Sequence, residues 1–240
     1  EAVQLSFVEA WITSLSYTFQ LYFDFSGYTD MAIGATLLFN IKLPLNFDSP
    51  YKSLNIQVFW RRWHMTLGRF LQKYVYIPLG GNRKGSARTY LNLMITFLIG
   101  GLWHGAGWTF IFWGFLHGAA LVIHRIWMKL NIRMPKLLAW FITFQFVNAS
   151  WVFFRATEWS DAIKVLRGMV NVESIGLTAV SPSSLLLVAA VFVLAVAFRN
   201  TNELQERFRP GFVMAGAVAA GAVFALIQMN RVSEFLYFNF

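Results

Sequence analysis

The strongest constraint in this sequence is a long segment that carries no formal charge. No Asp, Glu, Lys or Arg occurs between Arg88 and Arg125. As one straight helix this segment would be about 54 Å long at 1.5 Å per residue, whereas the hydrocarbon core of a bilayer is about 30 Å thick. We therefore predict two membrane-spanning helices, separated by a break within the glycine-rich stretch 100–108 (GGLWHGAGW).

The composition favours an integral membrane protein. Of the 240 residues, 57% are hydrophobic and 13% are charged, well below the roughly 25% charged residues of soluble domains. The formal net charge is +9, and the basic residues responsible for it lie in short gaps between apolar stretches. We therefore predict that these basic residues set the orientation in the membrane and contact anionic lipid head groups, and that they do not bind nucleic acid. The absence of Cys excludes disulfides and thiolate metal sites.

Further apolar stretches extend this prediction to a multi-span helical bundle. Four of them are candidates for membrane helices: residues 5–23, 137–154, 184–198 and 211–229. Polar residues 24–30 are predicted to end the first helix, and a short second helix is predicted at 31–41. Residues 43–51 contain two prolines and are predicted to be irregular backbone that lines a cavity or lies at the surface. We expect an all-α membrane protein with broken helices and a single domain over 1–240. The chain does not begin with Met, so we also expect an N-terminal part to be missing.

The charged segments predict an orientation in the membrane. Residues 53–78 mix cations with Trp, Phe and Leu, as an amphipathic or re-entrant segment does. Basic residues gather in three gaps, at 81–88, 129–136 and 199–210. With alternating spans these gaps lie on one side, which is predicted to be cytoplasmic. The break near 105–107 and the segment 156–180 would face outward, and the aromatic tail 234–240 would lie at the interface.

His104 is the strongest candidate for chemistry because it lies in the uncharged segment between Trp103 and Trp108. A histidine there is costly to bury without a partner, and ionisable groups inside membranes commonly serve function. With an unperturbed pKa near 6.5, it suits a general base. The alternative is a polar residue satisfied by a neighbouring helix. The residues alone leave both interpretations open.

Other polar residues have weaker signals. His64 follows Arg61 and Arg62 in an aromatic stretch, where such residues often only anchor a helix. The three could instead bind the anionic group of an acyl carrier. Asp24 fits helix capping or a polar tunnel wall. A second pair of histidines, His117 and His124, is seven residues apart with no carboxylate nearby, which argues against a metal site.

Five motifs occur in a fixed order along residues 20–118. They are 21–34 (LYFDFSGYTDMAIG), 43–51 (LPLNFDSPY), 59–64 (FWRRWH), 76–82 (YIPLGGN) and 101–105 (GLWHG). In these motifs the sequence resembles the membrane-bound O-acyltransferases, in particular the alginate O-acetyltransferase branch, which is related to the D-alanyl transfer protein of teichoic acid synthesis. The resemblance covers the C-terminal part of the family's chain and implies helices around a central tunnel.

The resemblance also implies roles for individual residues. His104 matches the family's principal catalytic histidine, and His64 matches its second active-site histidine. We expect Arg61 and Arg62 to help bind substrate, together with three further residues of the motifs: Trp103, Asn46 and Asp24. No bound metal or cofactor is expected. The acyl donor would be a co-substrate on the cytoplasmic side, either acetyl-CoA or a loaded acyl carrier.

The expected function is transfer of an acyl group, most simply acetyl, to hydroxyls of an extracytoplasmic polysaccharide or to a partner carrier. His104 would act as the base or would carry the acyl group. The resemblance implies a multi-pass protein of a bacterial inner membrane, surrounded by lipid. Its partner would be an extracytoplasmic acetyltransferase or a polymer-export protein. A transporter or flippase with an intramembrane polar site is the alternative function, and a membrane scaffold is a third.

Overall fold

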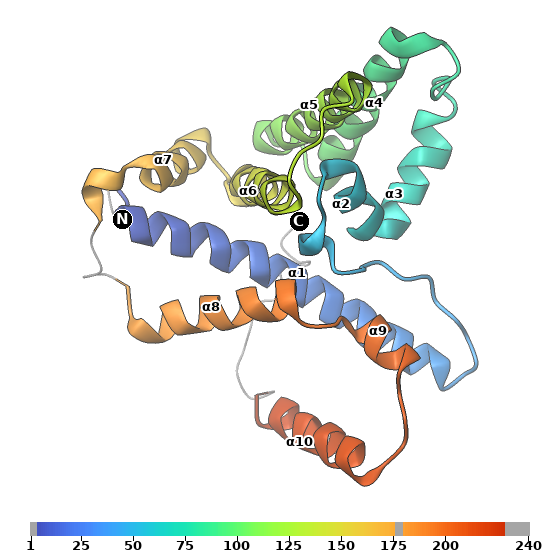
Figure 1. Ribbon diagram of the computed structural model, residues 1–240, viewed down its shortest axis with the longest axis vertical. Coiled ribbons are helices and arrows are strands. Elements are labelled where there is room, and N and C mark those ends of the chain that lie inside the picture. The colour runs from blue at the N-terminus through green and yellow to red at the C-terminus, as the bar shows by residue number, and fades with distance from the viewer. Residues whose placement is uncertain (1–3, 176–179, 229–240) are drawn as a thin grey trace. The chain divides into compact units, whose positions relative to one another are not determined.

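The computed structural model describes residues 4–175 and 180–228, and every regular element in these ranges is helical (Figure 1). The contacts divide the chain into two compact units, Glu1–Phe198 and Arg199–Phe240. The expectation of one membrane domain over the whole chain stays a prediction, and the aromatic tail 234–240 lies outside the described residues.

The first unit contains most of the helices. In chain order these are α1 (Phe7–Leu37), η1 (Pro50–Lys52), α2 (Ile56–Arg62), α3 (Met65–Leu71), η2 (Gln72–Tyr76), α4 (Gly85–His104), α5 (Trp108–Leu130), α6 (Lys136–Arg155), α7 (Trp159–Val170), η3 (Val172–Ser174) and α8 (Pro182–Ala197). The second unit contains α9 (Thr201–Glu206) and α10 (Phe212–Gln228).

Helix α1 is continuous, so the predicted interruption at residues 24–30 is wrong. Its polar residues are accommodated within the helix, as shown by Thr29, whose hydroxyl donates to the carbonyl of Ser26 at 2.9 Å. The helix ends later, where Asn40 adopts a left-handed conformation with φ 57° and Ile41 N–H donates to the Thr36 carbonyl. At its start, Ser6 and Glu9 form a reciprocal capping box.

Helices α4 and α5 form an antiparallel hairpin, and the break between them lies where the length of the uncharged segment predicted it. The chain leaves helical geometry only at residues 105–107. The two helices approach so closely that a Cβ added to Gly101 would lie 2.3 Å from the Phe110 carbonyl oxygen. Gly114 faces the Phe97 carbonyl in the same way. The glycines are therefore required for the contact between the helices.

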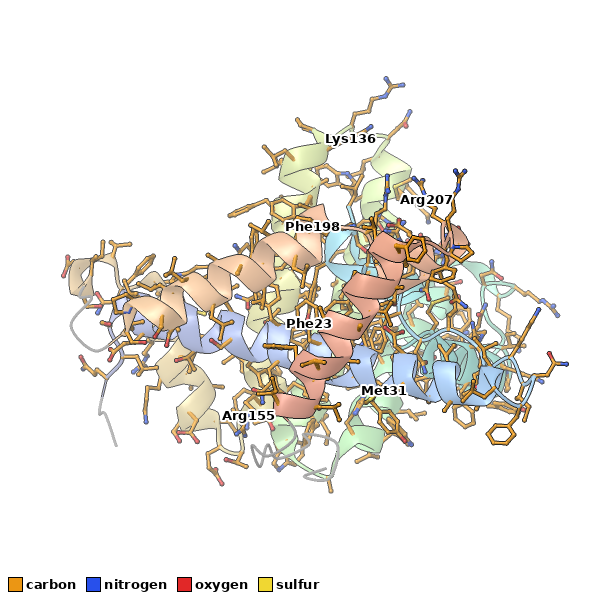
Figure 2. All side chains as sticks on the ribbon, turned by 90° about the horizontal axis from the view of Figure 1, so that it is seen from below. Phe23, Met31, Lys136, Arg155, Phe198 and Arg207 are labelled. Atoms are coloured by element: carbon orange, nitrogen blue, oxygen red, sulfur yellow. The ribbon has the colours of Figure 1, made fainter. Side chains whose placement is uncertain are left out.

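Two described helices, α5 and α6, are long and apolar enough to cross a membrane. Figure 2 shows Lys136 and Arg155 at the two ends of α6, which are the positions expected for charged residues flanking an apolar span. The shorter helices α8 and α10 are also apolar and match the predicted stretches closely. Crossing by further helices stays a prediction.

The predicted amphipathic segment 53–78 is not one helix. It forms α2, α3 and the π-helical turn η2, with a sharp change of direction at Trp63 and His64. The preceding irregular segment packs on it, because Asp48 N–H donates to the Arg62 carbonyl and Met65 N–H donates to the Asn46 carbonyl. These two bonds fix the junction between α2 and α3.

Candidate functional site

His104 is the last residue of α4, at the closed end of the α4–α5 hairpin. The following residue, Gly105, brings the backbone so close to α5 that an added Cβ would lie 2.7 Å from the Phe110 ring. The opposite end of the hairpin carries the basic turns, where Lys129 Nζ donates to Ser86 Oγ at 2.7 Å. His104 therefore lies at the end of the hairpin that is remote from its cationic residues.

Aromatic rings from three helices surround the His104 imidazole. The ring centroid of Trp103 lies 4.8 Å away, that of Phe154 4.9 Å away and that of Trp113 5.3 Å away. Within residues 4–175 and 180–228, neither ring nitrogen of His104 has a hydrogen-bond partner. Apolar walls orient the ring without occupying its nitrogens, so a nitrogen is available to a reacting group.

His64 lies at the junction of α2 and α3 in a left-handed conformation, with φ 42° and ψ 55°. This conformation is uncommon for a residue with a side chain and needs support from its surroundings. Asn46 supplies that support. Its side-chain oxygen accepts from Thr66 N–H at 3.2 Å and from the Thr66 hydroxyl at 2.5 Å. The irregular segment around Asn46 therefore has a defined purpose, which is to hold the turn that presents His64.

The contacts of Thr66 also indicate the protonation of His64. The Thr66 hydroxyl donates its one proton to Asn46, so its 3.4 Å contact with His64 Nδ1 fits an imidazole that carries its proton at Nδ1. Burial lowers the pKa of His64 to about 4, so the ring is neutral at pH 7. A neutral ring with the proton at Nδ1 leaves Nε2 as a hydrogen-bond acceptor.

Trp103 brings the two histidines into one site. Its ring centroid lies 6.4 Å from that of His64 and 4.8 Å from that of His104. Phe25 of α1 packs edge-on against His64 at 4.8 Å. Trp103 is 56% exposed, so the surface between the histidines is reachable. The catalytic and binding roles of these residues stay predictions.

The other predicted binding residues lie on several elements. Arg62 lies near Asp48, with Nε 3.8 Å from the carboxylate. Arg61 points elsewhere and lines a cavity. Asp24 is partly buried on α1, directly before Phe25. Asp24, Arg61 and Arg62 are thus on the elements that surround His64, and their binding roles stay predictions.

The cavity beside Arg61 has a volume of about 630 Å³ and is strongly basic. No Asp or Glu is among the described residues that line it, whereas four arginines are: Arg61, Arg69, Arg83 and Arg125. Its apolar wall includes Trp60 and Phe97, and it reaches Met65, the residue after His64. Neither His64 nor His104 lines it, so the predicted tunnel stays a prediction.

His117 and His124 do not form a metal site with other residues in the described part of the chain, where no group of three His, Asp or Glu is close enough to hold an ion. His117 is fully buried and hydrogen-bonded to Trp60 and Ser150.

Some residues around the histidines could not be identified from the sequence. Thr66 is only two residues from His64, so its closeness in sequence could have indicated it. Trp113 and Phe154 come from other helices, and no spacing relates them to His104.

Comparison with known proteins gives consistent results. The sequence profile of the membrane-bound O-acyltransferase family (MBOAT) matches residues 1–157. A peptidoglycan O-acetyltransferase of Helicobacter pylori is 47% identical over 100% of this chain and 51% of the relative. A protein named a probable alginate O-acetylase, from Pseudomonas aeruginosa, is 48% identical over 68% of this chain and 32% of the relative.

A more distant relative is a teichoic acid D-alanyltransferase of Bacillus subtilis, 32% identical over 55% of this chain and 37% of the relative. The chain thus spans about half the length, or less, of the curated relatives it matches. Both histidines that contact Trp103 fall within the matched residues 1–157.

Proposed function

Because the chain belongs to the membrane-bound O-acyltransferase family, we propose that it transfers an acetyl group to a hydroxyl of an extracytoplasmic polysaccharide. The observation that carries this proposal is the placement of His64 and His104 against the same exposed Trp103. Two imidazoles beside a reachable surface provide the proton acceptors that hydroxyl attack requires.

His104 is proposed as the general base. Its unbonded nitrogen takes the proton of the acceptor hydroxyl while the hydroxyl oxygen attacks the acyl carbon. The bond between the acyl carbon and the donor then breaks, and the proton passes from His104 to the departing group. In the other route, a nitrogen of His104 attacks the acyl carbon, the bond to the donor breaks, and the donor leaves with the proton that the acylated ring gives up. The acceptor hydroxyl then attacks the acyl carbon, the bond to the imidazole breaks, and the hydroxyl proton returns to the ring. Both routes need the same free nitrogen.

His64 is proposed to orient the reacting hydroxyl. With the proton on Nδ1 facing Thr66, its Nε2 accepts a hydrogen bond but does not donate one. This favours alignment of the acceptor over stabilisation of negative charge at the acyl carbonyl. Asn46 contributes by holding the turn in its left-handed geometry. Trp103, exposed between the histidines, would pack against the acyl group or the acceptor.

The basic cavity is proposed to receive the anionic donor. Four arginines without an acidic partner in the cavity wall attract phosphate groups, such as those of acetyl-CoA or of a carrier's prosthetic group. Arg83 and Arg125 belong to the basic end of the hairpin, which the positive-inside rule places at the cytoplasm. His104 lies at the other end, so donor and acceptor would approach from opposite sides through a tunnel.

The acceptor side of the proposal rests on the relatives. They are named for the acetylation of peptidoglycan and alginate and the D-alanylation of teichoic acid, all of them polymers with many hydroxyls. We place this protein in the bacterial inner membrane as a multi-pass protein. An extracytoplasmic acetyltransferase or polymer-export protein would be its partner.

The test is His104→Ala in the membrane-inserted protein, with His124→Ala as a matched control on the neighbouring helix. Membranes containing each variant are supplied with radiolabelled acetyl donor, and label in extracted surface polymer is measured. We expect His104→Ala to abolish transfer and His124→Ala to preserve it. Transfer at the wild-type rate by correctly inserted His104→Ala protein would refute the proposal, and would favour a transporter or scaffold.

A further inference from the structure

His117 has a hydrogen bond at each of its two ring nitrogens, and the proposed chemistry does not use it. Its side chain is fully buried on α5. Trp60 Nε1 of α2 donates to His117 Nδ1 at 3.1 Å. On the other side, His117 Nε2 lies 3.0 Å from Ser150 Oγ of α6. One imidazole thus joins three helices.

These bonds permit a single protonation state. Ser150 Oγ donates its proton to the Val147 carbonyl at 2.8 Å, so it can only accept from His117, and Nε2 must carry the proton. The Trp60 indole always donates, so His117 Nδ1 must be unprotonated. A charged ring, with protons on both nitrogens, would place two donors face to face at Trp60. His117 is therefore held neutral, as the Nε2–H form.

The same residue contacts the supports of both site histidines. Trp113, one helical turn before His117 on α5, has its ring centroid 4.8 Å from His117 and 5.3 Å from His104. Trp113 is 2% exposed and contacts both imidazoles. On the other side, Trp60 lies four residues before His64, at the end of the short helix α2. Displacement of His117 would therefore reach both His104 and His64.

We propose that His117 is a positioning residue that sets the spacing between His64 and His104. This inference rests on the proposed acyl transfer. The Trp60 bond fixes the end of α2 that presents His64. The contact with Trp113 fixes the wall against which His104 packs. An apolar residue of similar size would fill the same space but leave the Trp60 N–H buried without an acceptor. A histidine supplies one acceptor and one donor at fixed positions on a rigid ring.

Three variants separate positioning from packing. His117→Phe keeps an aromatic ring but removes both hydrogen bonds. His117→Asn keeps an acceptor near the Nδ1 position, facing Trp60. The matched control is His124→Phe, the same change on the same helix. We expect His117→Phe to lower kcat for acetyl transfer by up to about 100-fold, because small displacements of reacting groups have effects of this size. KM should stay unchanged, His117→Asn should recover part of kcat, and His124→Phe should match wild type.

A second measurement does not depend on activity. Nitrogen-15 NMR of histidine-labelled protein in nanodiscs reports the tautomer of each imidazole. We expect His117 to show the Nε2–H form, and the His117→Phe variant to shift the signals of His64 and His104. If wild-type protein transfers acetyl to no acceptor, the proposed function fails and these spectra still decide the positioning role.

Three results would overturn the inference. One is unchanged His64 and His104 signals in the His117→Phe variant. Another is a kcat loss that only follows the fraction of unfolded protein, with Asn no better than Phe. The third is a raised KM at unchanged kcat. If His117→Phe fails to insert, Ser150→Ala removes the Nε2 bond, together with the Ser150 bond to the Val147 carbonyl, and leaves the Trp60 bond in place. It should shift the His117 signals and lower kcat by less.

Discussion

His104 and His117 both contact Trp113, yet their surroundings are opposite. His117 is fully buried, with both nitrogens bonded by Trp60 and Ser150. His104 is only partly buried, at a helix end beside an exposed tryptophan, and no described residue bonds its nitrogens. Both histidines pack among aromatic rings, so this packing does not separate the chemical role proposed for His104 from the structural role proposed for His117. The hydrogen bonding of the ring nitrogens is what differs between them.

The largest expected effect tests this comparison directly. His104→Gln should lower the rate of acetyl transfer by about 10²–10⁴-fold, the range for loss of a general base, without lowering the thermal stability. His117→Leu should lower stability by about 1–3 kcal/mol, because the Trp60 N–H loses its acceptor and the Ser150 hydroxyl loses one of its two hydrogen bonds. Initial rates and thermal unfolding in detergent measure the two effects. A stability loss in His104→Gln that equals that of His117→Leu would contradict the comparison.

The hairpin that carries both histidines can be disturbed with one methyl group. Gly101→Ala places a Cβ 2.3 Å from the Phe110 carbonyl oxygen, so α4 and α5 must separate. We expect a loss of about 1–3 kcal/mol in the free energy of unfolding, as for other overpacked sites, and weaker acetyl transfer. Thermal unfolding of the purified protein measures the loss of stability. The control is Gly27→Ala, where an added Cβ has no neighbour within 4 Å; equal effects of both changes would disprove the close contact.

A smaller effect is expected at the turn that presents His64. Asn46→Ala removes the oxygen that accepts two hydrogen bonds from Thr66, at a typical net contribution of about 1 kcal/mol each. Acetyl transfer should fall about 30-fold through loss of the His64 geometry, since about 2 kcal/mol is lost in all and 1.4 kcal/mol corresponds to a factor of ten. Initial rates at saturating donor check this. Asn46→Asp keeps an acceptor oxygen and should retain more activity than Asn46→Ala; the reverse order would show that Asn46 does not act through Thr66.

The smallest effect concerns the cavity, far from both nitrogens. Arg61→Gln should raise KM for an anionic acetyl donor by about tenfold, the loss of one charge-assisted hydrogen bond, with kcat unchanged. Added salt should reduce the difference in KM between wild type and Arg61→Gln, because ions screen the attraction between the arginine and the donor. Arg133→Gln removes one charge from the same basic end without altering the cavity wall. If Arg133→Gln raises KM as much as Arg61→Gln, the overall charge and not the cavity attracts the donor.

Much of the fold follows from apolar length. The predicted stretches 137–154 and 184–198 agree with α6 and α8 to within two residues, because ends of apolar segments are marked by Lys, Arg or Pro. The interruption at 24–30 failed for a local reason. Asp, Ser and Thr resemble helix-ending signals, but a hydroxyl such as that of Thr29 can bond within the helix instead.

The site was only partly predictable. His64, His104 and Asn46 stand in recognisable motifs, so the sequence made them candidates. The hydrogen bonds around these residues could not be predicted from the sequence. Thr66 and Asn46 are 20 positions apart, and Trp60 and His117 are 57 positions apart. Contacts at such separations depend on how helices pack, and no periodicity of the chain encodes them.

The sequence by itself determined where the chain must break. An uncharged segment of this length cannot cross a bilayer once, so the glycines around His104 had to separate two helices. Only the tertiary structure decided which histidine is free to react. Whether a ring nitrogen is bonded depends on the donors and acceptors that other helices bring to it. For His117 these come from α2 and α6, and for His104 the neighbouring helices bring only aromatic rings.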